Sequence, residues 1–188
     1  MEKRLDGKKV AILVADGFEQ IELTEPKKAL EEAGATTQIV SPARGEVQGW
    51  NHDEKADRFE VDMALDRARS DDYDALLLPG GVRNPDQLRV LTRAVEFVDG
   101  FFAAGKPVAA ICHAPWTIIE TGVLRGKTIT SWPSLKTDLE NAGATWVDRE
   151  VVVESGLVTS RRPDDIPAFN QKMIEQFAEG RQATQRAA

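Results

Sequence analysis

Residues 8–15 read KKVAILVA, an apolar run that follows two lysines and ends at Asp16 and Gly17. Its apolar residues are consecutive rather than alternating, which is typical of a strand buried on both faces. Strands of this kind belong to parallel sheets that helices cover on each side. The run therefore predicts a parallel sheet near the amino end of the chain.

Further apolar strands alternate with helical segments along the chain. Pro26 favours a regular helix that begins near Thr24, so residues 16–23 are expected to form a loop or a single turn. Two weaker strand signals around the polar residues 51–58 predict an exposed hairpin or excursion. The other expected elements are strands at 36–40, 74–78, 107–111, 128–132, 146–153 and 157–160, and helices at 92–104, at 114–120 and from 163 onward.

This alternation indicates an α/β fold with a doubly wound, mostly parallel sheet between helices. We expect one domain over residues 1–180 and a frayed tail over residues 181–188. Ligands of such sheets bind beyond the carboxyl ends of the strands, where the strand order reverses. The segments that follow three strands, 16–22, 80–81 and 112–113, are therefore the places to look for a site.

Composition excludes several classes of function. The 24 basic and 31 acidic residues give a formal net charge of −7, which does not favour binding to a nucleic-acid backbone. A single cysteine forms no internal disulfide, and the first apolar run is too short for a signal peptide or a membrane span. We expect a cytoplasmic protein with no membrane partner and no stable nucleic-acid partner, because a reducing compartment also suits a working thiolate.

Cys112 is that single cysteine, and it lies where the apolar strand 107–111 gives way to a short helix. The positive end of a helix dipole favours the thiolate, so this position is that of a candidate nucleophile. A buried cysteine that only packs is the alternative. His113 follows directly and could act as a base only if Cys112 sits in a strained strand–turn–helix elbow, because neighbours on a helix point about 100° apart.

Residues at the other two strand ends could assist a thiol. Glu19, Asp16 and Asp86 are candidates for the acid that orients His113, although Asp16 and Glu19 could equally form a helix-capping box. A backbone N–H of Gly80-Gly81 could face an oxyanion, or the pair could simply form a turn.

Metal and cofactor chemistry has no motif in the sequence. His52, the other histidine, lies in a polar stretch and is expected to be a solvated surface residue. One cysteine and two distant histidines make no metal-binding spacing, and no phosphate-binding glycine loop is present. We therefore expect no metal and no cofactor.

Several motifs in one order resemble the PfpI-like intracellular protease family. That family lies in the superfamily that includes the Parkinson-disease-associated deglycase and the class I glutamine amidotransferase-like domains. The motifs that carry the resemblance are DGFEQIEL (16–23), DALLLPGG (74–81), VAAICH (108–113), GVLRGK (122–127), NAGA (141–144) and TSRRP (159–163). The resemblance covers nearly the whole chain and implies a flavodoxin-like fold.

The resemblance also implies roles for individual residues. Cys112 matches the family's nucleophile, with His113 beside it, and Glu19 matches the protonated carboxyl that hydrogen-bonds the thiol. Gly81 matches the glycine whose amide forms an oxyanion site together with the backbone of His113. Asp86 matches an acid that reaches the histidine of a neighbouring subunit, so the resemblance implies a homo-oligomer, either a dimer or a hexamer.

Two departures from the family pattern concern the site. Asp86 stands where the family more often has glutamate, after a segment one residue longer, which shortens its reach toward the histidine. Ala114 replaces a frequent glycine next to the elbow.

The expected function is that of a stress-response cysteine enzyme that acts on reactive dicarbonyls or glycated amines, as a glyoxalase or deglycase. An intracellular cysteine peptidase is the second reading. The third is a redox-sensing or chaperone protein in which Cys112 is oxidised and no substrate is turned over.

Overall fold

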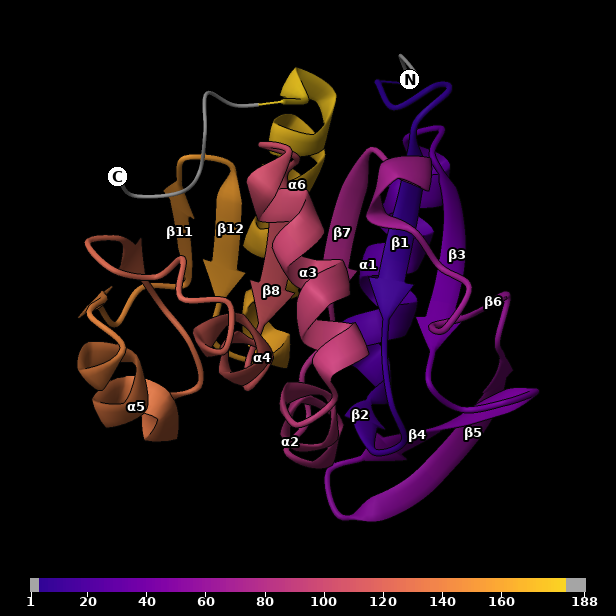
Figure 1. The fold of residues 1–188 in the computed structure, drawn as a ribbon, viewed down its shortest axis with the longest axis horizontal. Coiled ribbons are helices and arrows are strands. Elements are labelled where there is room, and N and C mark those ends of the chain that lie inside the picture. Colours follow the sequence, from indigo (N-terminus) through magenta and orange to yellow (C-terminus); the bar gives the residue numbers. More distant parts are fainter. Residues whose placement is uncertain (1–3, 182–188) are drawn as a thin grey trace.

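A central sheet of seven strands organises the chain in the computed structural model, which describes residues 4–181. Figure 1 shows the strand order β11-β12-β8-β7-β1-β3-β6 across the molecule. All neighbours pair in parallel except β11 and β12, which are antiparallel. The strands are β1 (Lys9–Leu13), β3 (Thr36–Ser41), β6 (Met63–Ala64), β7 (Ala75–Leu78), β8 (Val108–Ile111), β11 (Val151–Glu154) and β12 (Leu157–Ser160).

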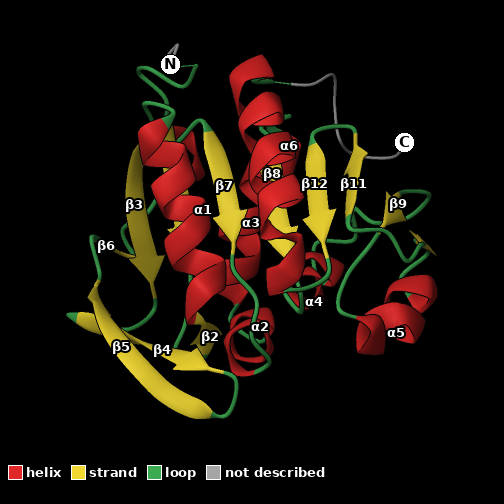
Figure 2. Cartoon of the chain, turned by 180° about the vertical axis from the view of Figure 1, so that it is seen from behind, coloured by secondary structure: helices red, strands yellow, loops and turns green. Residues whose placement is uncertain are grey.

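Helices cover both faces of this sheet. In Figure 1, α3 (Thr92–Ala103) crosses the near face, and α4 (Pro115–Ile119) and α2 (Arg83–Arg89) lie below it. In Figure 2, which shows the molecule from behind, α1 (Gln20–Glu32) and α6 (Ile166–Glu179) cover the other face. The predicted α/β sheet between helices is therefore confirmed.

The consecutive apolar residues of β1 serve two cores. Val10 and Ile12 pack in the cluster under α1 and α6, whereas Ala11 and Leu13 pack in the cluster under α3. Successive side chains of a strand point to opposite faces, so a strand with a core on each side must be apolar at every position.

Two smaller sheets lie outside the central sheet. The strands β4 (Glu46–Asn51) and β5 (Glu54–Glu60) form an antiparallel hairpin, and the two-residue strand β2 (Phe18–Glu19) pairs with β4 in parallel. The two-residue strands β9 (Thr128–Ile129) and β10 (Thr145–Trp146) pair beside α5 (Lys136–Asn141). Three short 3-10 turns complete the described part, at Ser70–Asp72, Pro133–Leu135 and Pro163–Asp165. The predicted hairpin is confirmed, and its second strand lies within the polar segment.

The expected loop or single turn over residues 16–23 and the expected helix start near Thr24 were both wrong. Helix α1 begins at Gln20 rather than near Thr24, so Pro26 lies inside the helix, where it is buried like Leu23 and Leu30. Proline removes one helical hydrogen bond, but burial of this face against the core offsets that loss. Helices α2 and α5 also went unpredicted, because each is too short to show a helical period.

The predicted frayed tail, residues 181–188, lies outside the described residues except for Arg181. Within residues 4–181, no helix combines the length and the hydropathy needed to cross a membrane.

Candidate active site

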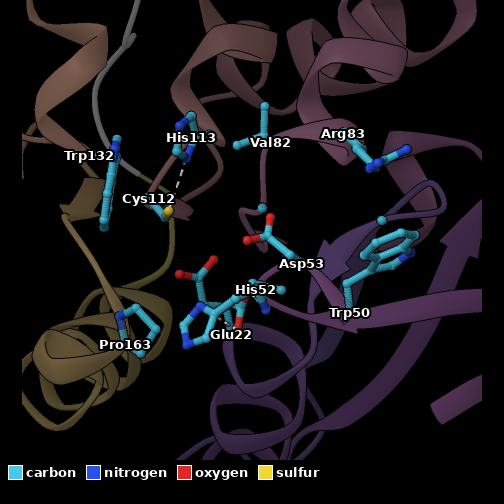
Figure 3. A pocket seen from close by; sticks show the side chains of 13 residues that line it. Glu22, Trp50, His52, Asp53, Val82, Arg83, Cys112, His113, Trp132 and Pro163 are labelled. Atoms are coloured by element: carbon cyan, nitrogen blue, oxygen red, sulfur yellow. Dashed lines mark hydrogen bonds and ion pairs between the residues drawn. The ribbon is translucent and has the colours of Figure 1, made fainter. Parts of the chain in front are cut away.

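The three strand ends singled out in the sequence meet at one edge of the sheet. Strands β1, β7 and β8 are neighbours and run in parallel, so the segments after them lie side by side, at the lower edge in Figure 1. They enclose a cavity of about 310 Å³ (Figure 3). Its lining residues are Gly17, Glu19, Glu22, Trp50, His52, Asp53, Gly81, Val82, Arg83, Cys112, His113, Trp132 and Pro163.

Cys112 occupies a strained elbow between β8 and α4. Its φ of 64° lies in the left-handed region, which costs a residue with a side chain about 1–2 kcal/mol. The surroundings hold the backbone there, because the Cys112 N–H donates to the Ser160 carbonyl and the Cys112 carbonyl accepts from the Trp132 N–H, each at 3.0 Å. The elbow that a Cys112–His113 pair requires is therefore present.

His113 turns its ring toward the sulfur. Its Nδ1 lies 3.1 Å from the Cys112 Sγ, and its ring is stacked on Trp132 and edge-on to Trp116. Burial lowers the pKa of His113 to about 4, so the imidazole is neutral at physiological pH. A neutral imidazole can accept the thiol proton through Nδ1 when a substrate arrives.

The carboxyl group against the thiol belongs to Glu22, and the expectation that it would be Glu19 is corrected. Glu22 is fully buried, lies against the Cys112 side chain and accepts from the Gly80 N–H at 2.8 Å. Burial raises the pKa of Glu22 to about 8, with a further contribution from the charge of Glu19. At neutral pH, Glu22 therefore keeps its proton and can donate it toward the sulfur.

The start of α1 explains the correction. With the helix beginning at Gln20, Glu22 falls on the inner face next to Leu23, whereas Glu19 precedes the helix on β2. The sequence did hold a signal for Glu22. Glu22 and Pro26 are four residues apart and so share one face of a helix, and that face is the buried one.

Glu19 lies at the mouth of the cavity instead. Its Oε2 accepts from the His52 backbone N–H at 3.1 Å, and its Oε1 is 3.8 Å from the His52 Nδ1. The Glu19 side chain thus holds the turn of the β4–β5 hairpin over the cavity. His52 is solvated as expected, with 84% of its side chain exposed, but it also lines the mouth of the cavity.

Backbone N–H groups approach the sulfur from two segments. Those of Gly81 and His113 hydrogen-bond Cys112 and lower the pKa of its thiol. Gly81 has a φ of 79°, and a Cβ atom there would lie 2.6 Å from the Gly17 carbonyl oxygen. A larger residue at position 81 would therefore move the Gly81 N–H away from the sulfur. These are the two amides that the sequence assigned to an oxyanion site.

Burial outweighs the amides at Cys112. It raises the pKa of the thiol well above its usual value, and the Glu22 carboxyl raises it further. The thiolate expected from the helix dipole is therefore not the resting form, because α4 is short and the sulfur is buried.

Asp86 takes no part in the cavity of its own chain. It is exposed on α2 and is absent from the lining. Trp50, Asp53 and Arg83 do line the cavity, although the sequence did not assign them to a site, and Trp132, which follows a strand end, lines it as well. In the residues that the structure describes, no group of three or more His, Cys, Asp or Glu side chains could hold a metal ion.

Comparison with known proteins identifies the family. The model of the DJ-1/PfpI family matches residues 8–176. The chain belongs to the DJ-1/PfpI family. Its fold is accordingly the flavodoxin-like fold of that family, as the resemblance implied.

Relatives within the DJ-1/PfpI family carry several names. A Bacillus subtilis protein named as a cysteine protease, YraA, is 46% identical over 167 residues, which cover 89% of this chain and 96% of the relative. General stress protein 18 of the same organism is 45% identical, over 89% of this chain and 96% of its own. A deglycase of Pyrococcus abyssi is 42% identical, over 89% of this chain and 98% of its own.

Solved structures of the family share the fold. DJ-1beta of Drosophila melanogaster superposes with a TM-score of 0.82 at 29% identity, covering 91% of this chain and 90% of that one. DJ-1 of Schizosaccharomyces pombe gives a TM-score of 0.78 at 28% identity, covering 89% and 90%. The names of the relatives support a cysteine enzyme and leave its substrate open.

Proposed function

We propose that this protein is a cytoplasmic stress-response enzyme that removes reactive dicarbonyls and their adducts with amines. The observation that carries the proposal is the surrounding of Cys112, where a neutral histidine and a protonated carboxyl both contact one buried sulfur. This arrangement suits addition of a thiol to an aldehyde, because the nucleophile is formed only as the carbonyl accepts a proton.

The proposed reaction begins with the Cys112 Sγ forming a bond to the aldehyde carbon of methylglyoxal. The thiol proton passes through His113 or Glu22 to the carbonyl oxygen, which gives a hemithioacetal. A proton then moves from that carbon to the neighbouring carbonyl carbon, and the hemithioacetal hydroxyl passes its proton to the oxygen of that carbonyl, which yields a thioester. Water hydrolyses the thioester to lactate and restores the thiol. The Gly81 and His113 amides face the sulfur and are available to the oxyanion of the hydrolytic step.

An amine adduct follows the same course with one additional bond broken. The carbon–nitrogen bond of a methylglyoxal hemiaminal breaks, and the amine leaves with a proton. The carbon skeleton then proceeds to lactate with the uptake of one water. The name of the Pyrococcus abyssi relative, a deglycase, supports this reading.

Hydrolysis of peptides is the second candidate, and the name of YraA favours it. The same thiol would attack the peptide carbonyl, with the same amides stabilising the oxyanion. The β4–β5 turn and Trp132 border the mouth of the cavity, which limits entry of a folded polypeptide. Dicarbonyl chemistry therefore ranks first.

The proposal includes a homo-oligomer in which the partner subunit's Asp86 approaches His113. Two features support it: Asp86 is exposed on α2, and it is absent from the cavity of its own chain. The neighbouring Val82 and Val90 are also exposed, at 55% and 76%, and would be covered by a second copy.

Cys112→Ala, assayed in parallel on methylglyoxal and on a fluorogenic peptide, tests the function. We expect the wild-type protein to convert methylglyoxal to lactate and the variant to lose that activity, while the far-ultraviolet spectrum stays unchanged. Lactate production that survives the substitution, or a wild-type protein active only on the peptide, would contradict the first reading.

The redox reading is tested by mass spectrometry after mild peroxide treatment. A sensor requires a selective oxygen adduct at Cys112 in a protein whose aldehyde consumption does not depend on Cys112.

A further inference from the structure

Arg83 and Trp50 form a wall of the cavity that lies away from the reacting sulfur. Figure 3 shows both side chains across the cavity from Cys112, and both line it. They come from different elements, because Arg83 is the first residue of α2 and Trp50 lies on β4. The tertiary fold therefore builds this wall from segments far apart in the sequence.

The Arg83 guanidinium is held in place. It lies 4.5 Å over the centre of the Trp50 ring, a distance typical of a cation–π contact. Its aliphatic stem packs on Gly17 so closely that a Cβ atom at position 17 would lie 2.6 Å from the Arg83 Cβ. A guanidinium fixed by stacking loses less conformational freedom when it binds a planar anion.

No acid among residues 4–181 is paired with this guanidinium. Within residues 4–181, the Arg83 side chain forms no ion pair and no hydrogen bond. Arg58 and Arg161, in contrast, are bound by Glu46 and by Asp148 and Asp165. An arginine that is held in one orientation and whose N–H groups face a cavity can bind an anion there.

A second hollow adjoins the cavity at this wall and adds positive charge. It shares Gly17, Trp50 and Arg83 with the cavity and is also lined by Lys55 and Arg58. Its one acid, Asp16, is engaged as acceptor of the Gln48 backbone N–H at 2.8 Å. Because Arg58 is paired with Glu46, it is Lys55 together with Arg83 that offers positive charge to a substrate extending past Arg83.

The cavity has room for a substrate larger than a free dicarbonyl. A volume of about 310 Å³ has room for about ten water-sized groups. A three-carbon dicarbonyl bound to Cys112 would leave the Arg83 side empty.

We propose that Arg83, stacked on Trp50, binds a carboxylate of the substrate while the reacting carbon lies at Cys112. The substrates assigned in this way are dicarbonyl adducts of amino acids or short peptides with a free carboxylate several bonds from the adduct. The proposal rests on the proposed function and names its substrate class. Asp53, an exposed acid that lines the same cavity, opposes the anion and so sets a limit on its affinity.

The test uses two substrates that differ in one charge: the methylglyoxal adducts of Nα-acetyl-lysine and of Nα-acetyl-lysine methyl amide. We expect Arg83→Gln to raise KM for the carboxylate adduct about tenfold, the loss of a charge-assisted hydrogen bond, with kcat little changed. KM for the methyl amide adduct should stay within twofold of wild type, and Asp53→Asn should lower KM for the carboxylate adduct.

Controls separate this proposal from the proposed function. Arg149→Gln removes the same charge from an exposed site outside the cavity and should change neither KM. Equal effects of Arg83→Gln on both adducts, or no effect on either, would overturn the carboxylate site while wild-type turnover still upheld the function. A wild-type protein inactive on free methylglyoxal and on both adducts would refute the function itself. In that case, binding of Nα-acetyl-lysine to wild type and Arg83→Gln, measured by calorimetry, decides the site, and equal affinities would overturn it.

Discussion

The Cys112 sulfur is surrounded by groups from three separate elements. Glu22 reaches it from α1, the Gly81 amide from the turn after β7, and His113 from the elbow after β8. Burial keeps the carboxyl and the thiol protonated and the imidazole neutral, so the resting site carries no charge at these groups at neutral pH. Such a site reacts by moving protons as bonds form rather than by presenting a free thiolate.

Glu22→Gln tests the protonated carboxyl at this scale. Between the usual carboxyl pKa of 4.5 and about 8, the folded chain keeps a proton on Glu22 that the unfolded chain has lost, so this group lowers stability as the pH rises through that range. Glutamine is neutral throughout and still accepts from the Gly80 N–H. We expect the variant to gain stability relative to wild type from pH 5 to pH 8, by a few kcal/mol at most.

Urea unfolding of both proteins at the two pH values measures this difference. The difference also cancels the opposite contribution of His113, whose lowered pKa makes stability fall as the pH drops from 6.5 toward 4. A difference that is the same at both pH values would show that Glu22 is ionised in the folded protein.

Among the elements, the β4–β5 hairpin depends most on single side chains. In the part of the chain that the structure describes, its strand pairing with the body of the protein is with the two-residue strand β2, next to a backbone hydrogen bond from Gly17 to Gln48. Side-chain hydrogen bonds add to this pairing. Glu19 accepts from the His52 backbone N–H, and Asp16 accepts from the Gln48 backbone N–H. Gln20 and Asp57 exchange two further hydrogen bonds. Because the hairpin carries Trp50, His52 and Asp53, its position decides the shape of the cavity.

Glu19→Ala tests this attachment. Losing a charge-assisted hydrogen bond of about 1.5–3 kcal/mol should raise the rate of tryptic cleavage at Lys55 about tenfold or more. Glu19→Gln keeps an acceptor and should stay near wild type, as should Glu25→Ala on the exposed side of α1. Loss of all turnover in Glu19→Gln would instead restore Glu19 as the carboxyl that serves the thiol.

At the scale of the whole molecule, His113 and Asp86 each lack a side-chain ion-pair partner in the described residues. His113 is buried between Trp116 and Trp132, yet among residues 4–181 no acid is hydrogen-bonded to its ring. Asp86 projects from α2 without a partner in the described chain. The proposed assembly of copies would complete both groups at once.

Complementation tests this assembly. Asp86→Asn and Cys112→Ala are each expected to be impaired, but a mixture that exchanges subunits should regain part of the activity. In a mixed assembly, the Asp86→Asn copy keeps its own Cys112 and receives the partner subunit's Asp86. Light scattering gives the size of the assembly, and a fully active monomer would contradict the role of Asp86.

Particular residues show how far the sequence alone reaches. The consecutive apolar residues of β1, β7 and β8 predicted a parallel sheet with two cores, and parallel strands end at one edge. The meeting of Cys112, His113 and Gly81 therefore followed from chain order and sheet geometry. Each of these residues lies within three positions of the end of a strand, and the structure adds that β7 and β8 are neighbours in the sheet.

The choice between Glu19 and Glu22, and the wall of Arg83 and Trp50, required the tertiary structure. The pairing of Phe18 with Gly49 places Glu19 on β2, so that α1 begins at Gln20. With this start, Glu22 lies on the buried face of the helix. The contact of Arg83 with Trp50 depends on where the hairpin packs against α2. Both depend on contacts between segments that are distant in sequence. Local propensities and hydrophobic periods carry no information about the energies of such contacts.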